Sequence, residues 1–336
     1  MFGKPAKVIN LVIEDYVIRM VEINGSNISS IKIKEKAIPF GLIENGKILD
    51  EIGFFEFMKK FVKEFGVKNR HVRFYVPNSL VIMRQVKFPM NLRDKEIDEY
   101  FREEIGKSLH LPFKDPVFDV HYLPLNGEGI ESEDELLPAT LFAAPKEEMM
   151  KYTEIFDDVS LKPVAADVEA LGVYRYFYHM NNVHRNHVYI IIELDVTSFN
   201  ISIFKRHQLE FLRYQTLDLH LVDSSSKYEN LGKIKWKYEE DEKDVRGVVE
   251  DQIVELERIM NFYRFSMKKG EEMVNELIIL GDHPFIDEFY QSAENHFDIP
   301  TRLLGSVISS VEDKEIGPQF IPALGLALKG GNTNAS

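Results

Sequence analysis

Residues 188–216 read VYIIIELDVTSFNISIFKRHQLEFLRYQT, and this stretch decides the fold. Apolar and β-branched runs with short polar breaks between them predict a strand, a tight turn and two further strands. The chain opens with the same pattern. A three-strand meander is therefore expected twice, at Val8–Ile13, Val17–Ile23 and Ile28–Lys36, and again at Val188–Leu194, Phe199–Lys205 and Leu209–Thr216. The repetition lies in the pattern rather than in shared residues, and it predicts a duplicated architecture.

Each meander is followed by segments with helical and strand patterns. After the first, apolar residues recur at helical spacing in Glu51–Phe65, and Val72–Val76 predicts a strand. After the second, the irregular polar stretch from Val222 to Arg246 is interpreted as an inserted loop or hairpin. The second half is then expected to continue with a long helix at Val248–Met267, a strand at Glu276–Leu280, a helix at Pro284–Asn295 and a buried terminal helix at Phe320–Leu328.

The region between these halves is expected to form a smaller α+β unit. Leu80–Phe88 predicts a strand ended by Pro89, and Asn91 can cap a helix whose apolar positions run on to Leu109. An acidic loop at Asn126–Glu135 is interpreted as a solvated hairpin tip. The remaining elements are expected to be strands at Val117–Leu123, Leu137–Ala144 and Leu161–Ala166, and helices at Lys146–Phe156 and Asp167–Met180.

Two halves that begin with antiparallel strands and continue as α/β suit the duplicated, RNase H-like fold that actin shares with its heat-shock relatives and sugar kinases. The fold class predicted is therefore α/β and actin-like, with an inserted small α+β subdomain. The expected boundaries are 1–78 for the first part of domain 1, 79–160 for the insert, 161–186 for the return to domain 1, 187–330 for domain 2 and 331–336 for a disordered tail.

Composition excludes several classes of function. The 336 residues carry 41 Lys and Arg against 55 Asp and Glu, a formal net charge of −14, which disfavours nucleic acid and anionic membranes as partners. The chain has no cysteine, so disulfides, thiolate metal sites and cysteine nucleophiles are excluded. No stretch approaches the roughly 20 apolar residues of a spanning helix, and no signal peptide is recognised. We expect a cytoplasmic protein that does not insert into the membrane.

Several segments resemble one family. Leu161–Leu171 (LKPVAADVEAL) is similar to the strand–helix junction that follows the inserted subdomain in PilM proteins, the actin-like proteins of type IV pilus biogenesis related to the division protein FtsA. Glu255–Arg264 (ELERIMNFYR) and Ala323–Gly330 (ALGLALKG) resemble the long helix and the closing helix of that family. Leu80–Pro89, with the charged helix after it and Leu111–Phe113, resembles the inserted subdomain. The resemblance runs in order over roughly the whole chain.

The resemblance implies a cytoplasmic scaffold, peripheral to the membrane, of a pilus or type II secretion-like machine. Such a protein binds the short cytoplasmic N-terminal tail of PilN, a single-pass inner-membrane protein, in a groove between its first subdomain and the inserted one. It links that platform to the pilus motor ATPase. The groove residues are not placed by this sequence.

The nucleotide loops depart from the family. Its active members carry Asp-x-Gly in each meander, because glycine lets backbone N–H groups approach phosphate and aspartate holds Mg²⁺. Here the aspartate positions are Val12 and Glu193, and the glycine positions are Glu14 and Asp195. Like charges at about 4 Å cost on the order of 4 kcal/mol at an effective dielectric near 20. Two such clashes remove most of a micromolar affinity, which is worth about 8 kcal/mol.

Further positions that would border a nucleotide in relatives are Asn200 in the second meander and Glu255 and Arg258 on the long helix, whose alternative interpretation is a solvated helix face. Gly281 is the glycine that remains of a Gly-rich turn under the adenosine. We expect no catalytic residue, no metal site and no cofactor, with binding of ATP and Mg²⁺ weakened or lost. His179, His184 and His187 are interpreted as a surface loop rather than a metal site.

The leading hypothesis is therefore a scaffold that has lost ATPase activity. The alternative is a nucleotide-binding actin-like ATPase switch of PilM or FtsA type that tolerates Glu193. A third interpretation, an FtsA-like division protein, is disfavoured because the C-terminal membrane helix of FtsA is absent.

Overall fold

The structure is a computed structural model that describes residues 7–23, 31–122, 136–181, 183–222, 234–305, 307–308 and 315–329. The predicted acidic loop at Asn126–Glu135 and the predicted tail at 331–336 lie outside the described residues. The chain divides into two compact units, Met1–Ser79 with Phe156–Ser336, and Leu80–Ile155.

The larger unit contains two five-stranded sheets of the same topology. In the first sheet the order is β10-β6-β1-β2-β3, and in the second it is β13-β12-β11-β14-β15. The first is built from β1 (Val8–Ile13), β2 (Val17–Ile23), β3 (Ile31–Ala37), β6 (His71–Tyr75) and β10 (Lys162–Asp167). The second is built from β11 (Val188–Leu194), β12 (Ser198–Lys205), β13 (Gln208–Thr216), β14 (Glu276–Leu280) and β15 (Thr301–Leu303).

In each sheet three antiparallel strands form a meander, and the other two strands join it in parallel. The antiparallel part follows from the alternation that the sequence shows, and the parallel part follows from the helices that cross over between strands. This duplicated order confirms the actin-like α/β fold. We call the two halves of the larger unit the first lobe and the second lobe, after the sheet that each contains.

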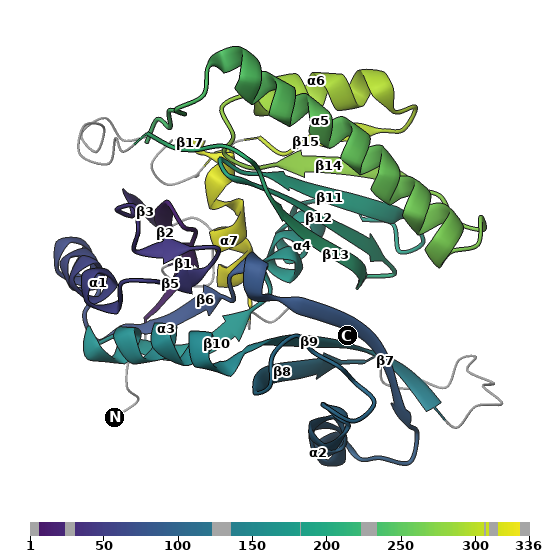
Figure 1. The fold of residues 1–336 in the computed structure, drawn as a ribbon, viewed down its shortest axis with the longest axis horizontal. Coiled ribbons are helices and arrows are strands. Elements are labelled where there is room, and N and C mark those ends of the chain that lie inside the picture. The colour runs from purple at the N-terminus through teal and green to yellow at the C-terminus, as the bar shows by residue number, and fades with distance from the viewer. Residues whose placement is uncertain are drawn as a thin grey trace. The chain divides into compact units, whose positions relative to one another are not determined.

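The helices of the larger unit cover these sheets (Figure 1). They are α1 (Glu51–Phe65), α4 (Glu169–Met180), α5 (Glu242–Asn261), α6 (Ile286–His296) and α7 (Ile321–Ala327). The side chain of Asp50 caps α1 at its start by accepting the N–H of Gly53, and Gly66 ends it with φ of 65°. Short elements complete the unit: β4 (Ile43–Glu44), β5 (Lys47–Ile48), β16 (Val307–Ile308), β17 (Glu315–Ile316) and the 3₁₀ turns η1 (Asn78–Leu80) and η4 (Pro318–Phe320).

Helices α4 and α7 are packed closely between the two sheets. A Cβ on Gly325 would lie 2.0 Å from the carbonyl oxygen of Gly172, so only glycine allows this approach of α7 to α4. Helix α7 contacts β1, β2 and β6 of the first lobe. Helix α4 stacks Tyr174 on Phe204 of β12, with 4.0 Å between the ring centroids. The two glycines therefore set the spacing between the lobes on this side.

The second sheet is buried on both faces. One face forms a core with α5 and α6, in which Ile190, Ile192 and Leu256 are fully buried. The other face carries Glu193, Asn200 and Ser202 toward α4, since side chains alternate along a strand. These polar residues lie inside the lobe, and Glu193 belongs to the site described below.

The smaller unit has a core of its own. Its sheet has the order β7-β9-β8, with β7 (Ile82–Pro89), β8 (Pro116–His121) and β9 (Leu136–Pro145) all antiparallel. Phe88 and Leu141 of the sheet pack with Ile97 and Phe101 of α2 (Asp94–Glu104). Helix α3 (Lys146–Asp158) follows β9.

The predicted bounds of two helices are wrong. Helix α2 begins at Asp94 rather than after Asn91, because Leu92 turns back to donate its N–H to the carbonyl of Pro89 and the Glu96 carboxylate accepts the N–H of Arg93. It ends at Glu104, short of Leu109. Helix α5 begins six residues before the predicted Val248, because the carboxylate of Asp241 accepts the N–H groups of Lys243 and Asp244. It ends at Asn261, and a π-helical turn continues from Phe262 to Met267.

Candidate functional site: the facing hairpin tips

The two meanders end in equivalent three-residue turns. Glu14, Asp15 and Tyr16 join β1 to β2, and Asp195, Val196 and Thr197 join β11 to β12. In each turn the first residue donates its N–H to the carbonyl of the first residue of the next strand, from Glu14 to Val17 and from Asp195 to Ser198, both at 2.9 Å. Glu14 and Asp195 therefore occupy matching places, one in each lobe.

Both turns face one small cavity of the larger unit. Five of the positions singled out in the sequence line it, namely Val12, Glu14, Glu193, Asp195 and Gly281. The other lining residues are Arg19, Glu169, Leu280, Pro318, Gln319 and Pro322. The cavity has room for about one water molecule. The duplicated fold thus brings together residues that are far apart in the chain.

Gly281 is required by the backbone at this place. Its φ is 137°, a value that side chains disfavour, and a Cβ there would lie 1.9 Å from the carbonyl oxygen of Leu194. The same carbonyl accepts the N–H of His283 at 3.2 Å. The turn after β14 is therefore held against the end of β11, and it places Asp282 beside both hairpin tips.

Four carboxyl groups lie around the cavity: those of Glu169 and Glu193 are buried, and those of Glu14 and Asp195 are partly buried. Burial raises the pKa of Glu14, Glu193 and Asp195 well above the usual range, and the neighbouring carboxylates raise it further. Burial also raises the pKa of Glu169 to about 7, although the Asn78 amide that donates to Glu169 acts in the opposite direction. These groups therefore ionise at a higher pH than exposed carboxyls do.

One buried cation, Arg19, lies among these carboxyl groups. The Arg19 guanidinium on β2 pairs through Nη2 with Asp282 and through Nε with Glu35 of β3, the latter at 3.3 Å. Only 4% of Arg19 is exposed. Burial alone lowers the pKa of Arg19, but the charges of Asp282 and its other neighbours raise it above its ordinary value. Arg19 is therefore charged and fully engaged by carboxylates of this chain.

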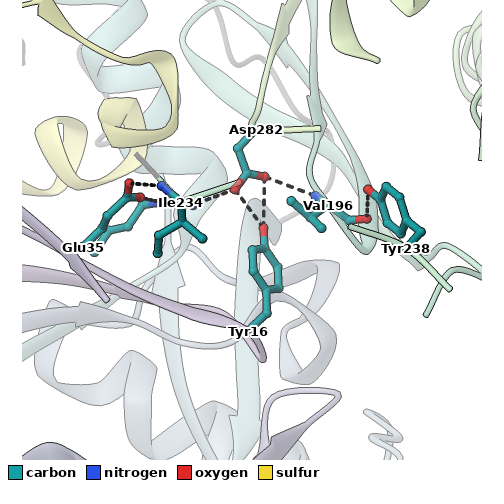
Figure 2. Close-up of polar contacts among 7 residues, drawn as sticks. Tyr16, Glu35, Val196, Ile234, Tyr238 and Asp282 are labelled. Carbon is teal, nitrogen blue, oxygen red and sulfur yellow. Dashed lines mark hydrogen bonds and ion pairs between the residues drawn. The ribbon is translucent and has the colours of Figure 1, made fainter. Parts of the chain in front are cut away.

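Asp282 joins the two tips (Figure 2). Its carboxylate accepts the hydroxyl of Tyr16 at 3.0 Å and the N–H of Val196 at 3.1 Å, in addition to the Arg19 pair. Tyr16 belongs to the first hairpin and Val196 to the second. Burial and the Asp282 charge raise the pKa of Tyr16, so its hydroxyl remains a donor.

Three predicted positions do not line the cavity. Asn200 lies directly opposite Glu193 in the sheet, and it is buried with both amide atoms lacking a partner among the described residues. Glu255 and Arg258 pair with each other on α5, with Nε to Oε2 at 2.8 Å, and Arg213 also pairs with Glu255 at 2.9 Å. The two α5 residues thus form a surface ion-pair group.

Sequence reasoning missed Arg19, Glu169 and Asp282. A signal for Arg19 is present: it is the only basic residue in the strand VIRMVEI, which is otherwise almost wholly buried. Asp282 directly follows Gly281. Glu169 lies within Leu161–Leu171, but no local pattern marks it as a site residue. Across the residues that the structure describes, no group of three or more His, Asp or Glu is arranged to hold a metal ion.

Two meanders with facing hairpin tips define an actin-like protein. Comparison with known proteins agrees with this class. The family model described as type IV pilus assembly protein PilM matches residues 11–330. The chain therefore belongs to the PilM family of type IV pilus assembly proteins. A search of curated proteins finds no match. Within the described part of the chain, none of the helices combines the length and apolarity needed to cross a bilayer.

Solved structures resemble the chain over most of its length. A structure titled PilM-PilN type IV pilus biogenesis complex is 20% identical, covers 98% of this chain and 100% of its own, and has a TM-score of 0.76. The ethanolamine utilization protein EutJ from Carboxydothermus hydrogenoformans is 11% identical, covers 98% and 91%, and has a TM-score of 0.50. The cytoplasmic domain of EpsL, an inner-membrane component of the type II secretion system of Vibrio cholerae, is 8% identical, covers 96% and 95%, and has a TM-score of 0.49.

Proposed function

We propose that this chain is a cytoplasmic, actin-like scaffold of a type IV pilus or type II secretion-like assembly machine. It binds the cytoplasmic N-terminal tail of a PilN-like inner-membrane protein, which holds it at the membrane. The observation that carries the proposal is the family match over residues 11–330, supported by the likeness to a PilM–PilN complex over 98% of the chain. The pilus motor ATPase is a second proposed partner.

The partner is tested with a synthetic peptide of the cytoplasmic tail of the PilN-like protein from the same organism. We expect the labelled peptide to bind the full chain with micromolar affinity, about −8 kcal/mol, in a fluorescence anisotropy titration. A scrambled peptide of the same composition is the control, because it keeps the charge and loses the order of side chains. Equal binding of both peptides, or of neither, would falsify the proposal.

We also propose that ATP binding is weakened or lost and that the chain does not hydrolyse ATP. Val12, Glu14, Glu193, Asp195, Asn200 and Gly281 are then vestiges of a nucleotide site, with Glu255 and Arg258 on its former border. Both tips carry a partly buried carboxyl group where relatives carry glycine, the cavity has room for about one water, and Arg19 is already paired. These residues do not fit phosphates and Mg²⁺.

Calorimetric titration with Mg-ATP and with ADP tests this second part. We expect no binding heat up to about a millimolar, a limit near −4 kcal/mol. Steady-state phosphate release should stay at the background rate. A micromolar isotherm would instead support the ATPase-switch alternative, since the hairpin tips would then have been misinterpreted.

Two double variants separate charge from backbone geometry. Glu14→Gln with Asp195→Asn removes both carboxylates but no side chain, while Glu14→Gly with Asp195→Gly also frees the backbone to approach phosphate. If the loop chemistry is the whole defect, only the glycine pair gains full affinity for Mg-ATP. If neither double variant gains affinity for Mg-ATP, the surrounding cavity has also closed.

A further inference from the structure

The segment from Ile234 to Tyr238 spans the two hairpin tips, and we call it the strap. Its backbone is held by two residues that follow β13, since Leu221 forms a β-bridge to Tyr238 and the N–H of Val222 donates to the carbonyl of Lys237 at 2.8 Å. Apolar side chains of the strap then form one cluster with both tips. That cluster contains Tyr16, Val17, Val196, Leu221, Ile234, Trp236 and Tyr238.

The first half of the strap contacts the first lobe. The N–H of Ile234 donates to the Glu35 carboxylate at 3.4 Å, the same carboxylate that pairs with Arg19 (Figure 2). The ring of Trp236 meets Tyr16 edge to face, with 4.8 Å between centroids. Such an edge-to-face pair stabilises the contact beyond what the burial of apolar area contributes.

The second half of the strap contacts the second lobe. The hydroxyl of Tyr238 donates to the carbonyl of Val196 at 2.8 Å, and its ring stacks on that of His283 at 5.6 Å between centroids. His283 is buried, and its Nδ1 accepts the N–H of Phe285 at 3.1 Å. Four residues apart, Ile234 and Tyr238 thus contact different lobes.

The strap and the Arg19–Asp282 pair contact the same three residues. Tyr16 contacts both, because its hydroxyl donates to Asp282 and its ring meets Trp236. Val196 also contacts both, because its N–H donates to Asp282 and its carbonyl accepts Tyr238. Glu35 accepts from Arg19 and from Ile234. Each tip is therefore held twice, by a buried charge and by an aromatic side chain.

We propose that this chain holds its two lobes together with its own residues, through a clasp formed by Arg19, Asp282, Tyr16 and the strap. The clasp closes the larger unit over the cavity between the hairpin tips, so that closure needs no bound ligand. This inference goes beyond the proposed function, and it stands whichever partner the chain binds. It assigns a purpose to Ile234–Tyr238, which lies within the stretch that the sequence analysis interprets as an inserted loop or hairpin.

The chain offers a built-in reporter for the clasp, because Trp236 is its only tryptophan. Acrylamide quenching and the emission maximum of the full chain therefore report on the strap alone. Breaking the buried pair with Arg19→Gln or Asp282→Asn is expected to raise the equilibrium constant for opening about a hundredfold. We expect a red-shifted maximum and stronger quenching. Tyr16→Phe, which removes one hydroxyl, should shift both in the same direction by less.

Arg302→Gln is the matched control, since it removes an arginine from a 2.6 Å pair with Glu276 inside the second lobe. It should leave Trp236 unchanged. Circular dichroism confirms that each variant is folded. The clasp is refuted if Trp236 stays equally shielded in folded Arg19→Gln, Asp282→Asn and Tyr16→Phe chains, or if Arg302→Gln exposes it equally.

A second measurement leaves the residues of the clasp unchanged. Because the chain lacks cysteine, Lys60→Cys on α1 and Glu250→Cys on α5 provide two exposed spin-label sites, one in each lobe. We expect one narrow distance distribution in the unliganded chain, unchanged by Mg-ATP. A broad distribution that narrows when Mg-ATP is added would overturn the clasp, because a ligand would then be closing the lobes.

Discussion

The two lobes carry different residues at the same three places of their meanders. In the first lobe Val12, Arg19 and Glu35 lie side by side across β1, β2 and β3. In the second lobe the matching row across β11, β12 and β13 is Glu193, Asn200 and Tyr214. The first row consists, in this order, of an apolar, a cationic and an anionic side chain. The second row consists of a carboxyl group, an amide and a phenol.

This difference shows how a duplicated fold can diverge without changing its backbone. Arg19 forms ion pairs with Glu35 beside it and with Asp282 in the other lobe. Asn200, at the same place in the second lobe, has no partner for either amide atom among the described residues. The first row therefore connects the two lobes, whereas in the second row only Glu193 lines the cavity. Four predictions test this comparison.

The largest effect is expected from Arg19→Met. Removing one partner of a buried pair leaves its carboxylates uncompensated, and it should lower the free energy of unfolding by about 3–5 kcal/mol. Urea titration measures the change. Arg246→Gln is the control, because Arg246 pairs with Glu288 at the surface and its loss should cost no more than about 1 kcal/mol. Equal losses for the two variants would contradict the role assigned to Arg19.

The next effect is expected from Gly281→Ala. A Cβ at 1.9 Å from the Leu194 carbonyl must push the turn away from β11, which together with the positive φ should cost about 3 kcal/mol. Thermal unfolding measures the loss. Gly247→Ala is the matched control in α5, where a Cβ meets nothing within 4 Å, and it should stabilise the chain by about 0.5–1 kcal/mol. A tolerated Gly281→Ala would show that the turn can move.

A smaller effect is expected from pH. The pKa of Glu169 is raised to about 7 in the folded chain, mainly by burial, against 4.5 when exposed. The folded chain therefore binds more protons than the unfolded chain between these values, and stability falls as pH rises from about 4.5 to 7. Glu169→Gln should flatten this fall by about 1 kcal/mol per pH unit. Urea unfolding of both chains at pH 5, 6 and 7 measures the slope of stability against pH. If Glu169→Gln leaves that slope unchanged, the raised pKa of Glu169 is refuted.

The smallest effect is expected from Asn200→Ala. An amide without partners contributes little when it is buried, so its loss should change stability by less than about 1 kcal/mol. Asn10→Ala is the matched comparison, because the Asn10 amide donates to the carbonyl of Val21 at 3.0 Å and the substitution removes that hydrogen bond. A larger loss at Asn200 than at Asn10 would mean that Asn200 has a bound partner in solution.

Most of the fold could be predicted from the sequence because alternation and helical spacing are local signals. The strands Val8–Ile13, Val17–Ile23 and Glu276–Leu280 and the helix Glu51–Phe65 match the structure to the residue. The predicted start of helix α5, Val248, lies six residues after the observed start, because the residues of its first turns are polar and hide the helical pattern. Asn91 looked like a cap, but the turn after Pro89 moves the start of α2 to Asp94.

For the site, the sequence alone predicted that the two turns match and that Glu14 and Asp195 hold equivalent places in them. Equivalent turns in a duplicated pattern are a local property, and the hydrogen bonds of Glu14 and Asp195 have the same geometry. Only the tertiary structure decided which charges meet. Arg19 and Asp282 are 263 residues apart, and no periodicity relates them. Their pairing follows from the folding of two sheets against each other, which buries both groups and leaves each as the other's counter-charge.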